Sequence, residues 1–326
     1  MTMPSPLCPY RMQVHHIIQE TPDVWTLALI NHDFYPYLPG QFALVSIDNG
    51  AAVRAYTLSS SPGQSRFITL TVRRLADGLG SRWLTQRVKP GDYLWLSAAQ
   101  GEFTCRDPAS DRYLFLAAGC GITPIMSMCR WLAANRPAAD VQVIYCVRSP
   151  EDIIFAATWL ALGNWLRLTV FTELDAGEVY QPGRLHREAL RALAPDIAAR
   201  TVMACGPAPW MEQQEADARA LGAENVVLER FHTPAPAAAA GLLTITRSRP
   251  LAAFSAPVGL SLLAALEAEK VPVNAACRAG VCGCCKTRIT AGRYRTTSTM
   301  TLSEQDIADG YVLACSCYPQ SDIVLA

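Results

Sequence analysis

Cysteines in the last quarter of the chain are spaced like the ligands of a metal cluster. Cys277, Cys282 and Cys285 form the pattern C-x4-C-x2-C, and Cys315 lies farther along. This is the spacing of plant-type [2Fe–2S] clusters, in which four thiolates converge on two irons. Glycines within the loop let the backbone wrap closely around the sulfides. The spacing therefore predicts a [2Fe–2S] site with these four ligands.

A zinc site is the alternative for the same cysteines. Structural zinc sites use paired C-x2-C motifs, whereas Cys315 and Cys317 are separated by a single residue. The five sulfurs between 277 and 315 also exceed what zinc needs. The cluster is therefore the preferred interpretation. Cys284 and Cys317 are then spare thiols, and an exchange of one ligand with a neighbour remains open.

Composition predicts a globular protein of two or three domains. The 326 residues are 51% hydrophobic, and 28 basic residues balance 28 acidic ones, which argues against nucleic-acid and membrane partners. The longest apolar run, 251–266, is broken by Pro257 and Gly259, so it is not a membrane span. Twelve cysteines without a secretory signal predict a cytoplasmic location.

Residues 11–107 predict an antiparallel β-barrel or sandwich. β-rich runs at 14–18, 25–30, 42–47 and 67–72 are separated by Pro, Gly and Asn turn signals. Within this region a period of two puts Arg54 and Tyr56 on one strand face and Thr57 and Ser59 on the other. An arginine can grip a phosphate, a tyrosine can stack on a ring, and a hydroxyl can donate a hydrogen bond.

A glycine-rich turn follows in the same region. Gly78, Gly80 and Ser81 lead into a helix predicted over 82–86, with Ser81 as its cap. A helix N-terminus of this kind binds phosphate through free N–H groups. Barrel strands also carry Arg and Tyr on solvated faces, so no single one of these residues decides the matter.

From about residue 111 the pattern changes to alternating strands and helices. A continuous apolar strand at 113–118 is followed by Gly119 and Gly121, then by Thr123 as N-cap and Pro124 as first residue of a helix. Two glycines at such a turn let a pyrophosphate approach. Pro124 stands where the third glycine of G-x-G-x-x-G would be, so the match to that fingerprint is partial.

Further strands at 141–147, 166–172, 201–204 and 225–228, with helices at 153–162, 185–193 and 209–221, predict a doubly wound α/β domain. Cys205, Gly206 and Pro207 close one strand at the edge where ligands bind in such sheets. A buried, inert cysteine is an equally good interpretation of Cys205 on spacing alone.

The last module covers 242–326, after a Pro-Ala linker. We expect a helix at 260–270, a strand at 286–289 and a short helix opened by a capping box at Thr301–Glu304 or Ser303–Asp306. Five cations and no acid occur from 278 to 295. This run is either a solvated face or a docking face for an acidic partner.

Taken together, the motifs around Arg54, Gly78, Gly119 and Cys205 resemble the ferredoxin–NADP⁺ reductase superfamily, and the C-terminal module resembles plant-type ferredoxin. Within this group the stretches 11–16, 277–286 and 311–317 are most similar to the NADH oxidoreductases of hybrid cluster proteins. The resemblance implies a multi-domain chain: an antiparallel β-barrel flavin domain (1–107), a doubly wound α/β nicotinamide domain (108–232), a linker (233–241) and an α+β, β-grasp ferredoxin domain (242–326).

The resemblance also implies FAD, NADH and one [2Fe–2S] cluster. Arg54 would bind flavin phosphate, Tyr56 would stack on the isoalloxazine, and Thr57 would donate to flavin N5. Cys205 would pack near nicotinamide C4 and act in catalysis with Thr57. The implied cofactor-binding residues are Arg54, Tyr56, Thr57, Ser59, Gly78, Gly80, Ser81, Gly119, Gly121, Thr123, Pro124, Gly206 and Pro207.

The expected function is electron transfer from NADH to a protein acceptor. A flavin can take two electrons as hydride and pass them on singly to a cluster. Resemblance suggests hybrid cluster protein as acceptor, in nitrogen-oxide or hydroxylamine metabolism. The alternatives are the reductase component of an oxygenase, with FAD or FMN, and a zinc-stabilised, non-catalytic interaction protein. Arg148 could attract the extra phosphate of NADPH, whereas Glu151 and Asp152 would repel it.

Overall fold

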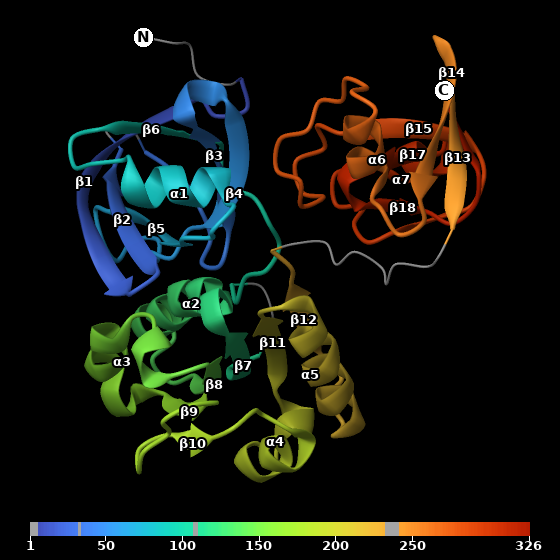
Figure 1. Ribbon diagram of the computed structural model, residues 1–326. Helices are drawn as coiled ribbons and strands as arrows, with labels where there is room; N and C mark the ends of the chain where they lie inside the picture. The colour runs from blue at the N-terminus through green and yellow to red at the C-terminus, as the bar shows by residue number, and fades with distance from the viewer. Residues whose placement is uncertain (1–5, 32–33, 107–109, 232–240) are drawn as a thin grey trace. The chain divides into compact units, whose positions relative to one another are not determined.

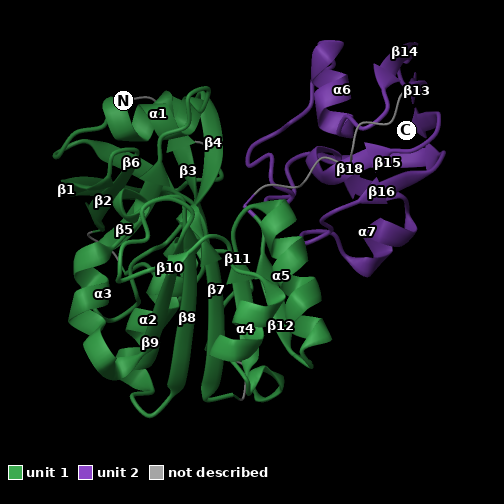
Figure 2. Ribbon diagram, turned by 60° about the horizontal axis from the view of Figure 1, so that its bottom comes forward, with its two compact units in different colours: residues 1–230 green, residues 231–326 purple. Residues whose placement is uncertain are grey.

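The computed structural model describes residues 6–31, 34–106, 110–231 and 241–326 (Figure 1). The chain divides into two compact units, 1–230 and 231–326 (Figure 2). The expected boundary at 107/108 and linker residues 233–240 lie outside the described residues. No helix in the described ranges is long and apolar enough to cross a membrane.

The first half of unit 1 is an antiparallel sheet that closes on itself, as predicted. Its strands run in the order β4-β3-β6-β1-β2-β5. A bridge from Leu58 to Leu70 joins the segment after β4 to β5, so the two edges meet. The elements are β1 (Tyr10–Thr21), β2 (Val24–Ile30), β3 (Phe42–Ile47), β4 (Ala52–Thr57), β5 (Ile68–Arg73), α1 (Leu79–Gln86) and β6 (Tyr93–Leu96).

The second half of unit 1 is a parallel sheet in the order β10-β9-β8-β7-β11-β12. Its strands are β7 (Arg112–Ala118), β8 (Asp140–Val147), β9 (Arg167–Thr172), β10 (Gln181–Pro182), β11 (Thr201–Cys205) and β12 (Val226–Glu229). Its helices are α2 (Ile122–Asn135), α3 (Ala156–Leu162), α4 (Arg187–Leu193) and α5 (Ala208–Ala220). From β7 the chain first moves towards β8 and β9 and later returns to β11 on the other side. This switch point opens a crevice at the carboxyl ends of β7 and β11.

Two predicted helix starts are wrong. Helix α2 begins at Ile122, after a 3₁₀ turn at Gly119–Gly121, so Thr123 is its second residue and not its N-cap. The Thr123 hydroxyl donates instead to the carbonyl of Cys120 (3.0 Å). Helix α1 begins at Leu79 after Gly78, which places Ser81 inside the first turn. In both cases the glycine turn itself supplies the helical entry, so no capping side chain is needed.

Unit 2 is a mixed sheet with one main helix packed against it, the predicted β-grasp arrangement. Strand order is β14-β13-β19-β15-β17, with a separate pair β16-β18. Ser303 and Asp306 form the capping box, whereas Thr301 is not a cap. The elements are β13 (Leu242–Ser248), β14 (Leu251–Pro257), α6 (Leu262–Ala268), β15 (Lys286–Ala291), β16 (Tyr294–Thr296), α7 (Glu304–Ala308), β17 (Tyr311–Leu313), β18 (Cys317–Pro319) and β19 (Ile323–Leu325).

A buried arginine ties together the amino ends of three parallel strands. The Arg200 side chain is 2% exposed and pairs with Asp140 at 2.6 Å and Asp196 at 2.9 Å. It also donates to the carbonyls of Tyr113 (3.2 Å) and Asp140 (3.3 Å). These bonds connect the amino ends of β7, β8 and β11, and the crevice lies at the carboxyl ends of the same sheet. They therefore stabilise the sheet without lining the crevice.

Replacing Arg200 with alanine should destabilise the protein by about 3 to 5 kcal/mol, because two carboxylates and two backbone carbonyls lose their common hydrogen-bond donor. Arg112 pairs with the same two aspartates, but its side chain is 47% exposed. Arg112→Ala should therefore cost less than about 1 kcal/mol. Urea unfolding followed by intrinsic fluorescence measures both variants, and equal losses would contradict this interpretation.

Candidate functional site

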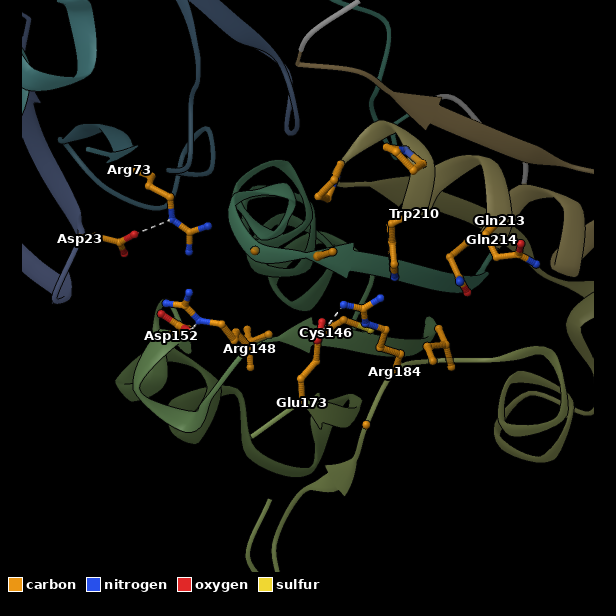
Figure 3. A pocket seen from close by; sticks show the side chains of 17 residues that line it. Asp23, Arg73, Cys146, Arg148, Asp152, Glu173, Arg184, Trp210, Gln213 and Gln214 are labelled. Atoms are coloured by element: carbon orange, nitrogen blue, oxygen red, sulfur yellow. Dashed lines mark hydrogen bonds and ion pairs between the residues drawn. The ribbon is translucent and has the colours of Figure 1, made fainter. Parts of the chain in front are cut away.

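A cleft of about 670 Å³ opens at the carboxyl edge of the parallel sheet. Asp23 and Arg73 come from the barrel, and the other lining residues come from the α/β half (Figure 3). The α/β half contributes, among others, Gly119, Arg148, Asp152, Glu173, Arg184, Pro207, Trp210 and Gln214. The cleft is therefore built by both halves of unit 1.

Of the three predicted glycines in this region, Gly119 lines the cleft, whereas Gly121 and Gly206 do not line it but allow neighbouring segments to pack closely. A Cβ at Gly121 would lie 1.9 Å from the carbonyl oxygen of Cys205, and one at Gly206 would lie 2.8 Å from the Trp210 ring. Gly119 has φ +52°, a conformation that favours glycine. A Cβ added at Gly119 would lie 3.2 Å from Arg73 Nη1, so the glycine packs against the Arg73 guanidinium. The structure thus brings Gly119, Gly121 and Gly206 together beside a cation.

Polar side chains in the cleft are suited to a ligand with hydrogen-bonding groups. Trp210 Nε1 and Gln214 Oε1 are buried and have no hydrogen-bond partner within the described part of the chain. Buried polar atoms are usually paired, so these two fit a bound molecule that supplies an acceptor and a donor. A dinucleotide, with amides, hydroxyls and a pyrophosphate beside Arg73, meets that requirement.

An ion pair that sequence reasoning missed lies in the same cleft. Glu173 directly follows β9, and its carboxylate pairs with Arg184 at 2.9 Å (Figure 3). Arg148 pairs more loosely with Asp152, at 3.7 Å. Glu173 could have been found from its place at a strand's carboxyl end, where acidic residues bind ribose hydroxyls. Glu151, which the sequence analysis named, does not line the cleft.

Cys205 is fully buried at the end of β11. In the register of the sheet it lies opposite Glu229 on β12. Burial raises the pKa of the Cys205 thiol well above its usual value and that of Glu229 to about 8. Glu229 is partly exposed as a residue, but its Oε2 atom is buried and lacks a partner within the described ranges. A neutral thiol and a neutral carboxyl thus lie side by side.

On the barrel, Arg54 and Tyr56 lie against the start of helix α1. A Cβ at Gly80 would lie 2.9 Å from the Tyr56 hydroxyl and 3.0 Å from Arg54 Cγ. Burial raises the pKa of Tyr56, so its hydroxyl stays protonated. The aliphatic part of Arg54 and the Tyr56 hydroxyl therefore lie beside the helix N-terminus, while Arg54 Nη1 donates to the Val53 carbonyl at 2.9 Å. A cation, an aromatic ring and a helix N-terminus in one region suit a flavin with its phosphates. Thr57 ends β4 and is 5% exposed.

Two predicted hydroxyl ligands have partners within the barrel. Ser59 Oγ lies 2.8 Å from the hydroxyls of both Thr69 and Thr71. Ser81 Oγ donates to the Gly78 carbonyl (3.2 Å) and accepts from Leu75 N (3.1 Å). Ser59 therefore stabilises the barrel strands, and Ser81 stabilises the glycine turn before α1.

In unit 2 the four predicted cysteine sulfurs converge. Cys285 Sγ lies 3.3 Å from Cys315 Sγ. Backbone N–H groups point at these sulfurs: Gly280 N lies 3.2 Å from Cys315 Sγ, and Ala279 N lies 3.4 Å from Cys277 Sγ. Hydrogen bonds between these thiols lower the pKa values of Cys277 and Cys285 and raise those of their partners Cys282 and Cys315. Sulfurs that contact one another and are met by backbone N–H donors fit an iron–sulfur cluster.

The two remaining cysteines of this module have other surroundings. Cys284 Sγ faces the carbonyl of Cys282, and Cys317 is fully buried in the hydrophobic core that also includes Cys285 and Cys315. Whether either spare thiol exchanges with a ligand stays open.

Two of the five cations in the run at 278–295 pair with carboxylates. Arg278 pairs with Glu267 at 2.5 Å, and Lys286 pairs with Asp306 at 2.5 Å. Arg288 donates to the carbonyl of Asp309 at 2.9 Å. Both acids come from outside the run, so counting charges within 278–295 alone overstates its positive charge. The choice between a solvated face and a docking face stays a prediction.

Comparison with known proteins agrees with this architecture. Family models match for the oxidoreductase FAD-binding domain at 11–105, the oxidoreductase NAD-binding domain at 115–216 and the 2Fe-2S iron-sulfur cluster binding domain at 246–320. The protein accordingly binds FAD, NAD and a [2Fe–2S] cluster. The matched ranges coincide with the barrel, the parallel sheet and the β-grasp module.

Full-length relatives have the same three-part plan. NADH oxidoreductase HCR of Escherichia coli (strain K12) is 60% identical over 100% of both chains. The glycine betaine monooxygenase reductase subunit of Pseudomonas aeruginosa (strain UCBPP-PA14) is 29% identical over 95% of this chain and 93% of that protein. The solved structure of phthalate dioxygenase reductase superposes with a TM-score of 0.67 over 97% of both chains, at 22% identity. The chain therefore belongs to the NADH oxidoreductase HCR family, within the ferredoxin reductases that carry a C-terminal [2Fe–2S] domain.

Proposed function

We propose that this flavin and iron–sulfur NADH oxidoreductase delivers its electrons to a hybrid cluster protein. The observation that carries the proposal is the 60% identity to NADH oxidoreductase HCR over the full chain, with no part of either protein left over. The likeness of the stretches 11–16, 277–286 and 311–317 to reductases of hybrid cluster proteins supports the choice of acceptor.

Residue roles follow from the geometry. Cys277, Cys282, Cys285 and Cys315 would hold the cluster, since their sulfurs converge. Arg54 and Tyr56 would hold FAD beside the start of α1. Gly119, Gly121, Gly206 and Pro207 would form the floor for NADH, with Arg73 next to its pyrophosphate. When bound, the flavin supplies the conversion from a two-electron donor to a one-electron acceptor.

Four further predicted residues would lie near the flavin and the nicotinamide or behind the glycine turn. Thr57 would present its hydroxyl to the flavin edge, and buried Cys205 would fill the space beside the nicotinamide. Glu229 lies opposite Cys205 and is neutral below its raised pKa of about 8. Below that pKa the end of β11 and the neighbouring position of β12 would therefore present no charge to a bound nicotinamide. Thr123 and Pro124 are buried within α2 and support the glycine turn from behind.

The acceptor can be tested by anaerobic reduction of purified hybrid cluster protein with NADH and catalytic amounts of this protein. We expect this acceptor to be reduced about tenfold or more faster than an oxygenase terminal component, since cognate interfaces favour the correct partner by several kcal/mol. Cys315→Ala should abolish transfer to the protein acceptor while NADH-driven ferricyanide reduction by the flavin persists.

The second candidate is the reductase component of an oxygenase, which the match to a glycine betaine monooxygenase reductase subunit favours. Faster reduction of an oxygenase component than of hybrid cluster protein would establish this alternative. Extraction and identification of the flavin then distinguishes FAD from FMN.

Glu173 is proposed to select NADH. Its carboxylate would accept hydrogen bonds from ribose hydroxyls and repel a 2′-phosphate, and it also occupies Arg184 at 2.9 Å. Glu173→Gln removes the repulsion and releases Arg184. We expect NADPH use relative to NADH to rise about tenfold, measured as the ratio of kcat/KM values with ferricyanide. Glu151→Gln is the matched control outside the cleft, and a rise as large in this variant would contradict the assignment.

Glu229 should make stability depend on pH. Its pKa is raised from 4.5 to about 8 in the folded protein, so folding retains a proton that the unfolded chain releases near 4.5. The free energy of unfolding therefore falls as pH rises through that window. Compared with wild type, Glu229→Gln should gain stability between about pH 5 and about pH 9. Urea midpoints report this change, and Glu224→Gln, at an exposed position, should track wild type throughout.

A further inference from the structure

A segment that supplies no cysteine joins the cluster loop to the distant fourth ligand. Ser298 Oγ donates to the Gly280 carbonyl at 2.6 Å, in the middle of the loop. Ser316 Oγ, next to Cys315, donates to the Ser298 carbonyl at 2.9 Å. Thr297 N also donates to the Ser316 carbonyl, at 2.9 Å. Ser298 thus lies between the two parts of the chain that must hold four sulfurs in register.

Both the N–H and the carbonyl of Gly280 make hydrogen bonds. Its N–H points at Cys315 Sγ from 3.2 Å, while its carbonyl accepts the Ser298 hydroxyl. Its φ of +71° allows both contacts at once. A Cβ there would lie 2.7 Å from Ser298 Cβ and 3.2 Å from Ser316 Cβ. The packing leaves little freedom, so the direction of the N–H depends on Ser298.

We infer that Ser298 is a positioning residue for the cluster: its hydroxyl fixes Gly280 so that the Gly280 N–H stays on the Cys315 sulfur. The inference rests on the proposed function, because it takes Cys315 as a ligand. An N–H donor stabilises the additional negative charge that the cluster gains on reduction. Loss of the Ser298 hydroxyl therefore makes the cluster harder to reduce, and it loosens the joint between the loop and Cys315.

The test compares Ser298→Ala, Ser298→Thr and Thr299→Ala in the full-length, anaerobically purified protein. Thr299 is an exposed hydroxyl residue in the same segment, which makes it a matched control. Iron and sulfide content, the midpoint potential from redox titration, and the rate of iron release to a chelator are measured. For Ser298→Ala we expect a more negative potential and iron release about tenfold faster, the scale of outer-shell effects on metal sites.

Ser298→Thr keeps the hydroxyl and should restore both values, and Thr299→Ala should match wild type. A Ser298→Ala potential and release rate equal to those of Thr299→Ala would overturn the inference. Should Ser298→Ala be isolated without iron, a fully loaded Ser298→Thr supports the role in retention, whereas an equally empty one contradicts it. Wild-type protein without iron and sulfide would instead refute the proposed function, so the two failures are distinguishable.

Discussion

Gly121 leaves no room for a side chain, because a Cβ there would lie 1.9 Å from the Cys205 carbonyl oxygen. The turn after β7 and the end of β11 touch through backbone alone at this point. Close to this contact, a Cβ at Gly206 would lie 3.0 Å from Ala118 Cβ, and Arg73 of the barrel lies against the Gly119 turn. The topological switch between β7 and β11 is the place where doubly wound sheets bind their ligands.

The same physical constraint operates in unit 2 with different chemistry. Gly280 lies against Ser298, again too close for a Cβ, and its N–H turns towards a sulfur. In unit 1 a side-chain cation lies beside the glycine turn, because Arg73 Nη1 would be 3.2 Å from a Cβ at Gly119. In unit 2 the backbone N–H groups of Ala279 and Gly280 point at cysteine sulfurs. The first unit thus offers a guanidinium, and the second offers backbone donors.

Sequence reasoning succeeded where a pattern is local. Cysteine spacing indicated the four sulfurs that converge, and the run at 42–47 coincides with β3. It failed where a partner is distant in the chain. Glu229 carries no local signal, because its importance comes from lying opposite Cys205 across two strands. The capping roles predicted for Ser81 and Thr123 were wrong, since a serine or threonine near a helix start does not reveal that a glycine turn already enters the helix.

Charge in the β-grasp module shows why distant partners matter for recognition. Glu267 and Asp306 neutralise Arg278 and Lys286, although all four are separated by at least eleven residues from their partners. Neutralised pairs contribute little to long-range attraction, which decays within about 10 Å at moderate salt. Of the five cations in 278–295, the two neutralised ones therefore contribute little to the long-range field of the module, whereas Arg288, Arg293 and Arg295 form no ion pair with a carboxylate among the described residues.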